Sequence, residues 1–118
     1  MIYLANSISL QMFKDLIRKD WELNITLREL DAEEAKVLLS TYFVSAVGHA
    51  GTAQFLSSLL GIEVPVSRQA ITLKKGDKLI VVQPMGPLRL QPGQELTAED
   101  MKRLYEEGKV KFILIQVP

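Results

Sequence analysis

The segment Gly48-His49-Ala50-Gly51-Thr52 is the part of the sequence best suited to carry chemistry. It lies between a β-prone apolar run and a helical pattern, so it is predicted to form a strand-to-helix turn. Small residues let a phosphate approach the backbone closely, and free N–H groups at a helix start bind anions. His49 could exchange a proton with such a phosphate near neutral pH. A surface or helix-capping histidine without function is the alternative, because such turns are common in α/β proteins.

Three further polar residues lie near the ends of predicted elements. Arg89 is the one cation of residues 84–93, a segment rich in proline and glycine. Long irregular loops in small domains are often functional, and a guanidinium suits a phosphate or the face of a base. Arg68 precedes one predicted strand and Gln83 ends another. For all three, an ordinary solvated side chain is the alternative interpretation.

The sequence offers few metal ligands. It has no cysteine and one histidine, which excludes disulfides, cysteine-based metal sites and histidine clusters. Acidic residues adjoin at positions 33–34, 99–100 and 106–107, where they are expected on solvated helix faces. No phosphate-binding P-loop, dinucleotide fingerprint or serine nucleophile elbow is present. We therefore expect neither a metal ion nor a cofactor.

Length and charge restrict the class of protein further. The 118 residues suit one domain, and no apolar run approaches the ~20 residues that span a bilayer. The N-terminus lacks the pattern of a signal peptide, so a cytoplasmic protein without membrane contact is expected. Fourteen basic residues balance fourteen acidic ones, whereas proteins that grip duplex nucleic acid usually carry a positive excess. A small ligand in a defined pocket is expected instead.

The periodicity of apolar residues predicts alternating strands and helices. Strands are expected at residues 2–5, 22–28 (near an edge), 41–47 (deep in the sheet) and 112–117. A hairpin is expected from strands 69–73 and 79–82 around a turn at 74–77. Helices are expected over residues 8–17, from 31, over 53–60 and from a cap at Thr97. The predicted fold is α/β: a single domain, residues 1–118, with a central mixed β-sheet flanked by helices.

Several short stretches resemble one family in the same order and spacing: the ring nucleases that act as anti-CRISPR proteins in archaeal viruses, with their prophage and CRISPR-associated relatives. These stretches are Tyr3-Leu4-Ala5-Asn6-Ser7, Ser45-Ala46-Val47-Gly48-His49, Leu60-Gly61 followed by Arg68, Val81-Val82-Gln83, Arg89-Leu90 followed by Gly93, and Leu104-Tyr105-Glu106-x-Gly108-Lys109-Val110-x-Phe112. The similarity extends over nearly the whole chain.

The resemblance implies a homodimer that binds cyclic tetra-adenylate, the messenger of type III CRISPR defence, across its interface and cleaves it without metal. The 2′-OH of a ribose would attack its own 3′-phosphate and leave linear di-adenylate with a 2′,3′-cyclic phosphate. In this mechanism His49 is the general acid, and Arg89 stabilises the phosphoryl charge. If the source is viral, the protein would act in the host cytoplasm. The remaining residues expected to bind the ligand are Asn6, Ser7, Gly48, Gly51, Thr52, Arg68 and Gln83.

One departure from the family concerns the loop. The family typically has a glutamate three residues after the loop arginine, and this chain has Pro92 there. Glu95 is close in sequence but does not align with that position. Two alternatives therefore stay open: a protein that binds cyclic oligoadenylate without cutting it, as a sensor or sponge, and a small regulatory protein that binds DNA or another protein.

Overall fold

A computed structural model describes residues 1–85 and 93–118. Its centre is a five-stranded sheet in the order β2-β5-β4-β1-β3. The strands are β1 (Ile2–Ala5), β2 (Thr26–Leu30), β3 (Val44–Ala46), β4 (Lys78–Pro84) and β5 (Val110–Gln116). β1 pairs in parallel with β3 and β4, while β5 is antiparallel to β4 and β2. The predicted α/β domain with a mixed sheet is confirmed.

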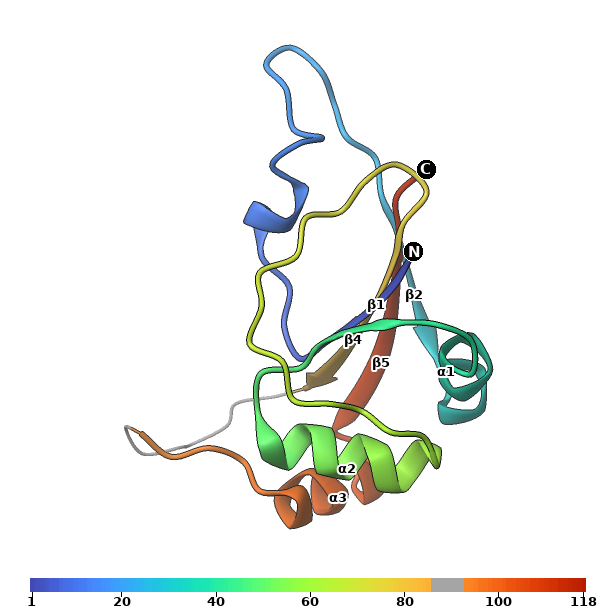
Figure 1. Cartoon of the computed structure of the whole chain (residues 1–118), viewed down its shortest axis with the longest axis vertical. Helices are drawn as coiled ribbons and strands as arrows, with labels where there is room; N and C mark the ends of the chain where they lie inside the picture. The colour runs from blue at the N-terminus through green and yellow to red at the C-terminus, as the bar shows by residue number, and fades with distance from the viewer. Residues whose placement is uncertain (86–92) are drawn as a thin grey trace.

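The three α-helices pack on one face of this sheet: α1 (Ala32–Leu39), α2 (Ala50–Leu60) and α3 (Ala98–Glu106) (Figure 1). Alternate strand residues point to this face, as the two-residue period of a strand requires. Leu4, Ile80 and Phe112 thus share one core with Leu39, Leu56 and Met101 of the helices. Within the described residues, none of the helices has the length and apolar character needed to cross a bilayer.

The other face of the sheet has an irregular cover. A short 3₁₀ helix, η1 (Leu10–Phe13), and an extended segment that contains Ile71 and Leu73 pack there against Leu79 and Ile115. The predicted hairpin is wrong, because β4 already pairs with β1 on one side and β5 on the other. Residues 69–73 therefore find no free edge on β4, and they lie on the sheet rather than in it. The turn at 74–77 does form, closed by a bond from the Asp77 N–H to the Lys74 carbonyl of 3.0 Å.

Three further predictions are wrong in extent or position. The helix expected over residues 8–17 is only η1, because Phe13 alone of that helix is buried and Ile8 and Ile17 stay exposed. The strand expected at 41–47 is only β3, and it lies at an edge rather than deep in the sheet. The strand expected at 22–28 is found later, as β2, although its predicted edge position is confirmed.

The helix boundaries follow local signals that the sequence carries. Asp31 and Thr97 each accept a hydrogen bond from the backbone three residues on, and both helices begin with a complete capping box. Gly61 ends α2 in the left-handed conformation, with φ of 66°, that favours glycine. The Thr97 cap fixes where α3 starts, and that start lies beside the site described next.

Candidate functional site

The carboxyl ends of the parallel strands β1, β3 and β4 meet at one edge of the sheet. Asn6 follows β1, His49 lies three residues after β3, and Pro84 ends β4. In open α/β sheets, ligands bind beyond the carboxyl ends of parallel strands. A cavity of about 280 Å³, the His49 pocket, opens here; its lining residues are Asn6, His49, Thr52, Val82, Pro84, Gln94, Glu95, Leu96 and Met101.

Two predicted ligand-binding residues brace the turn that carries His49. The Gly48 N–H donates to Oδ1 of Asn6 at 3.0 Å, and Nε of Arg68 donates to the Gly48 carbonyl at 2.8 Å. A Cβ atom on Gly48 would lie 3.2 Å from Cγ of Arg68, so glycine suits this position. The structure therefore brings Asn6, Gly48, His49 and Arg68 together.

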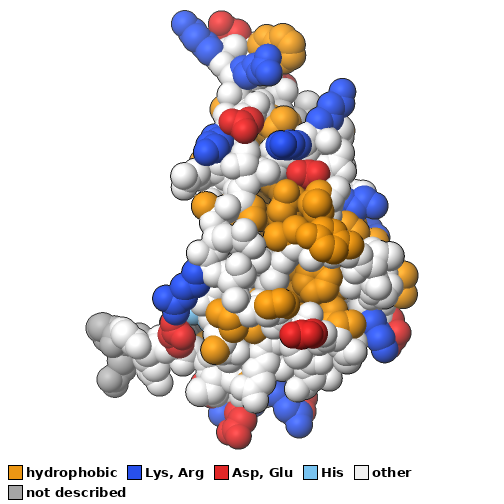
Figure 2. Space-filling model, in the orientation of Figure 1, with side chains coloured by type: hydrophobic (Ala, Val, Ile, Leu, Met, Phe, Trp, Pro, Cys, Tyr) orange, Lys and Arg blue, Asp and Glu red, His pale blue; other side chains and the backbone are white. Residues whose placement is uncertain are grey.

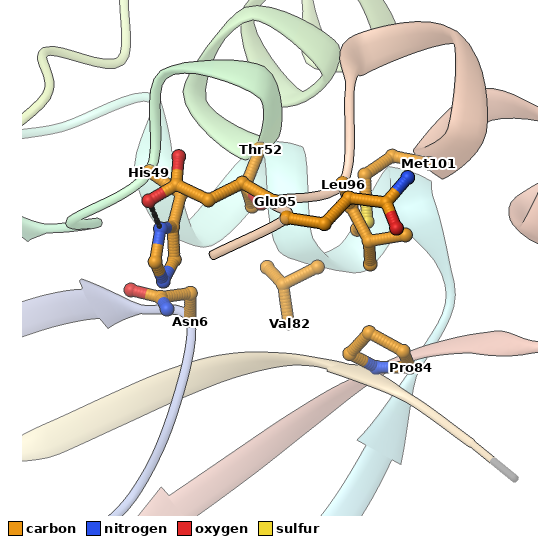
Figure 3. Close-up of a pocket in the computed structure, with 9 residues that line it drawn as sticks. Asn6, His49, Thr52, Val82, Pro84, Glu95, Leu96 and Met101 are labelled. Carbon is orange, nitrogen blue, oxygen red and sulfur yellow. Dashed lines mark hydrogen bonds and ion pairs between the residues drawn. The ribbon is translucent and has the colours of Figure 1, made fainter. Parts of the chain in front are cut away.

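The imidazole of His49 has a carboxylate partner. Nδ1 of His49 lies 3.0 Å from Oε1 of Glu95 (Figure 3). An ionised carboxylate only accepts hydrogen bonds, so Nδ1 carries the hydrogen and Nε2 is left for a ligand. Figure 3 shows that the far ring nitrogen points toward Asn6, at the polar end of the pocket.

Glu95 is shared with Arg68, whose Nη2 lies 3.3 Å from the same Oε1 atom. The side chains of His49, Glu95 and Arg68 are 44%, 50% and 72% exposed. Ion pairs this exposed typically stabilise a fold by only about 0–1 kcal/mol. The network therefore contributes little to folding, and its consequence is the orientation of the histidine. Because His49 caps the N-terminus of α2, where the helix dipole is positive, the Glu95 carboxylate also balances the charge there.

Gly51 allows Glu95 to reach His49. A Cβ atom on Gly51 would lie 2.3 Å from the Leu96 carbonyl oxygen and 3.0 Å from Thr97. The backbone of residues 96–97 thus packs directly on the first turn of α2, at a distance that only glycine permits. Gly51, which the sequence predicted to bind ligand, lies in contact with this segment.

The other residues that the sequence predicted for the site lie in different places. Thr52 is only 6% exposed and lines the His49 pocket. Ser7 is exposed and is not part of that lining. Gln83 lines a different groove, on the sheet face opposite the α-helices, where its side chain donates to the Pro84 carbonyl. Arg89 lies outside the described residues.

Sequence reasoning assigned no role to Glu95. The family pattern pointed to position 92, and nothing local marks a glutamate two residues before a helix cap as special. The Thr97 cap fixes where α3 begins, but it does not indicate that the segment before the helix lies against α2.

The charges of the surface are interspersed. Figure 2 shows basic and acidic side chains scattered over the visible face, without a broad area of one sign. Within the described ranges, no three histidine or acidic side chains gather in a way that could hold a metal ion. What the site does offer is one imidazole, a carboxylate and an arginine around a partly apolar cavity.

Comparisons with known proteins found a matching family, related sequences and a solved structure of the same fold. A family described as STIV B116-like matches residues 2–112. Uncharacterized protein 26 of Sulfolobus islandicus filamentous virus is 36% identical over 88% of this chain and 84% of its own length. Uncharacterized protein ORF117 of Acidianus two-tailed virus is 33% identical over 69% of this chain and 67% of its own. The structure of B116 of Sulfolobus turreted icosahedral virus has the same fold, with a TM-score of 0.71, 24% identity and coverage of 98% and 97% of the two chains.

Proposed function

The chain belongs to the STIV B116-like family of archaeal virus proteins, and from this premise we propose that it is a metal-independent nuclease that opens cyclic tetra-adenylate. The observation that carries the proposal is the pairing of His49 with Glu95 inside a pocket at the carboxyl edge of the sheet. In this arrangement Glu95 binds Nδ1 of His49, and Nε2 is left to face a bound phosphodiester. The identity of the substrate is inferred from the resemblance of this sequence to the anti-CRISPR ring nucleases.

The proposed reaction forms one bond and breaks one. The 2′-oxygen of a ribose attacks its own 3′-phosphorus in line, and the bond from phosphorus to the 5′-oxygen breaks. The proton of the 2′-OH passes to solvent, and Nε2–H of protonated His49 donates a proton to the leaving 5′-oxygen. The products carry a 2′,3′-cyclic phosphate and a 5′-OH. Cleavage at two opposite phosphates would give linear di-adenylate.

The first turn of α2 supports phosphate binding at this place. His49 caps that helix without a side-chain capping bond, so its ring is not occupied by the helix itself. The positive end of the helix dipole favours an anion nearby. Arg68 adds a guanidinium beside Glu95, and in the proposal Arg89 stabilises the charge of the phosphoryl oxygens. Much of the rate would come from holding the ring in in-line geometry.

A homodimer would suit both the ligand and the surface. A cyclic tetranucleotide has near two-fold symmetry, which matches two identical subunits. The sheet face opposite the α-helices has a groove of about 390 Å³, the sheet-face groove, lined by Val81, Ile113 and Ile115 and by the exposed side chains of Ile8, Leu27 and Met85. Exposed apolar surface of this kind often marks a protein interface. Gln83 lies in the same groove, so it would join the ligand site through the dimer.

A binding protein that does not cut the ring is the second candidate. Pro92 stands where the ring nucleases typically have a glutamate, and this departure favours a sensor or sponge. The Glu95 carboxylate beside His49 favours the nuclease, because a pure binding site needs no fixed imidazole tautomer.

Incubation of the purified protein with cyclic tetra-adenylate and a chelator, followed by chromatography, tests the proposal. Linear products with a cyclic phosphate end support the nuclease. Intact ring that stays bound to the protein supports the second candidate, and intact ring without binding contradicts both.

A further inference from the structure

Arg68 joins two segments that lie far apart in the sequence. Its Nε donates a hydrogen bond of 2.8 Å to the Gly48 carbonyl, 20 positions earlier, and its Nη2 lies 3.3 Å from Oε1 of Glu95, 27 positions later. Gly48 belongs to the turn before α2, and Glu95 belongs to the segment before α3. One guanidinium thus connects the residue next to His49 with the carboxylate that His49 contacts.

The backbone on either side of Arg68 is bound to β3 and to the residues that follow this strand. The Ser67 N–H donates to the Val47 carbonyl at 2.8 Å, and Nε2 of Gln69 donates to the carbonyl of Ser45, in β3, at 2.7 Å. Because the main chain is held on both sides, only the side chain of Arg68 must be ordered to form its two bonds. The planar fork of an arginine loses less freedom per hydrogen bond than an ammonium group does.

The contact between His49 and Glu95 needs a further partner to hold its geometry. Both side chains are about half exposed, and an isolated ion pair at such a site contributes little, because ordering two side chains costs entropy. An ionised carboxylate oxygen accepts more than one hydrogen bond, so Oε1 of Glu95 can bind Nδ1 of His49 and Nη2 of Arg68 together. A second donor on this oxygen restricts the rotation of the Glu95 side chain, and the restricted carboxylate orients the imidazole.

The direction of the guanidinium separates Arg68 from the cavity. In the part of the chain that the structure describes, His49 and Glu95 line the His49 pocket and Arg68 does not. Two of its nitrogens, Nε and Nη2, are directed at protein oxygens. These bonds favour a role that Arg68 exerts through Glu95, in addition to the ligand contact expected from the sequence.

We propose that Arg68 is a positioning residue, which holds the Glu95 carboxylate against Nδ1 of His49 and thereby leaves Nε2 to face the ligand. The inference rests on the proposed function for the reaction that the histidine performs. Its structural consequence, one fixed tautomer of the imidazole, is a property of the ligand-free protein and is measured without substrate.

The ring nitrogens of His49 report the tautomer directly, because the chain has a single histidine. In ¹⁵N-labelled, ligand-free protein at about pH 8.5, where an ordinary imidazole is neutral, the wild type is expected to show one ring nitrogen with a hydrogen and one without. Arg68→Ala is expected to give a mixture of tautomers, in which the two ¹⁵N signals move toward each other. Unchanged signals in a folded Arg68→Ala would overturn the proposal. Arg28→Ala is the matched control, since Arg28 is an exposed arginine that pairs with Glu34, and neither residue lines the His49 pocket.

Arg68→Lys distinguishes the fork from the charge. Lysine keeps the positive charge, but its compact ammonium cannot reproduce the planar fork that reaches Gly48 and Glu95 at once. We therefore expect the ¹⁵N signals of Arg68→Lys to resemble those of Arg68→Ala. Wild-type signals in Arg68→Lys would overturn the two-bond arrangement as the cause of the fixed tautomer.

A double variant tests whether Arg68 acts through Glu95. Once Glu95→Gln has removed the carboxylate, Arg68→Ala should have no further effect on the ring signals, because two residues that act through one contact are not additive. An equal shift from Arg68→Ala in the wild-type and the Glu95→Gln backgrounds would overturn the proposal.

Cleavage rates separate this role from ligand binding. With cyclic tetra-adenylate, Arg68→Ala is expected to lower kcat about 3- to 30-fold, a part of what general acid–base catalysis contributes. A higher KM with unchanged kcat would assign Arg68 to ligand binding alone and overturn the proposal.

The outcome is separate from that of the nuclease proposal. A mixture of tautomers in Arg68→Ala supports the positioning role even where the wild type leaves cyclic tetra-adenylate intact. Ring cleavage by the wild type, together with an unchanged tautomer in Arg68→Ala, would overturn the positioning role and leave the nuclease standing.

Discussion

Nδ1 of His49 lies 3.0 Å from Oε1 of Glu95, although the two residues are 46 positions apart in the sequence. The contact joins the cap of α2 to the segment that leads into α3. It fixes which nitrogen of the imidazole carries the hydrogen and which one faces a ligand. The proposed chemistry depends on this pair more than on any other contact of the site.

Glu95→Gln tests the pair directly. The amide keeps the size of the side chain but no longer compels Nδ1 to be the donor. General acid–base catalysis typically raises a reaction rate about 10²- to 10⁴-fold. We expect Glu95→Gln to lower kcat about 10- to 100-fold and to change KM little. Because His49 is the one histidine of the chain, ¹⁵N signals of its ring report the tautomer without overlap.

Glu106→Gln is the control, since Glu106 lies on an exposed face of α3 and, in the described part of the chain, forms an ion pair with Lys102 alone. A Glu95→Gln protein with unchanged kcat and an unchanged tautomer would remove Glu95 from the account.

Gly51→Ala tests how Glu95 is brought to His49. The added methyl group would meet the Leu96 carbonyl at 2.3 Å, so residues 96–97 must move away from α2. Overpacking of this kind costs about 1–3 kcal/mol of unfolding free energy, and displacement of Glu95 should lower kcat as well. Urea unfolding and cleavage rates measure the two effects. Gln54→Ala, on the exposed side of the same helix, should change neither, and a Gly51→Ala protein with wild-type stability would contradict the close approach.

The cap of α3 predicts a pH dependence of stability. The Thr97 N–H, which donates to the Asp100 carboxylate, lowers the pKa of Asp100 below its ordinary value of 3.8. A lowered folded-state pKa stabilises the fold above the unfolded-state value and ceases to do so as pH falls through the folded-state value. Asp100→Asn should therefore unfold at lower urea than the wild type near neutral pH. The difference should shrink as pH falls below 3.8, and a difference that stays constant would contradict the assignment.

Leu27→Asp tests the proposed dimer. Leu27 is 61% exposed and lines the sheet-face groove, so a charge there should disrupt association without unfolding the subunit. Sedimentation equilibrium is expected to show a dimer for the wild type and a monomer for the variant. Val37→Asp is the control, because Val37 is 67% exposed on α1, which packs on the other side of the sheet. A monomeric wild type would contradict the dimer.

Local signals predicted the parts of the fold that depend on neighbours in sequence. Asp31, Gly61 and Thr97 marked helix boundaries correctly, because capping involves residues only a few positions apart. The hairpin prediction failed because strand pairing is non-local. Residues 69–73 have the composition of a strand, yet both edges of β4 are already occupied by β1 and β5.

The same distinction applies to the site. Gly48 and His49 could be predicted as a strand-to-helix turn, and the structure places Asn6 and Arg68 against it. Glu95 could not be predicted, because its contact depends on the close approach of the 96–97 backbone to Gly51. That approach is a property of how α2 and α3 pack, which no short stretch of sequence records.

The most direct measurement compares the wild type with His49→Ala in the presence of cyclic tetra-adenylate and EDTA. The wild type should convert the ring to linear di-adenylate with a 2′,3′-cyclic phosphate end, and His49→Ala should bind the ring and lose most of the cleavage. Intact ring in both samples, or equal cleavage by both, would contradict a metal-independent nuclease that acts through His49.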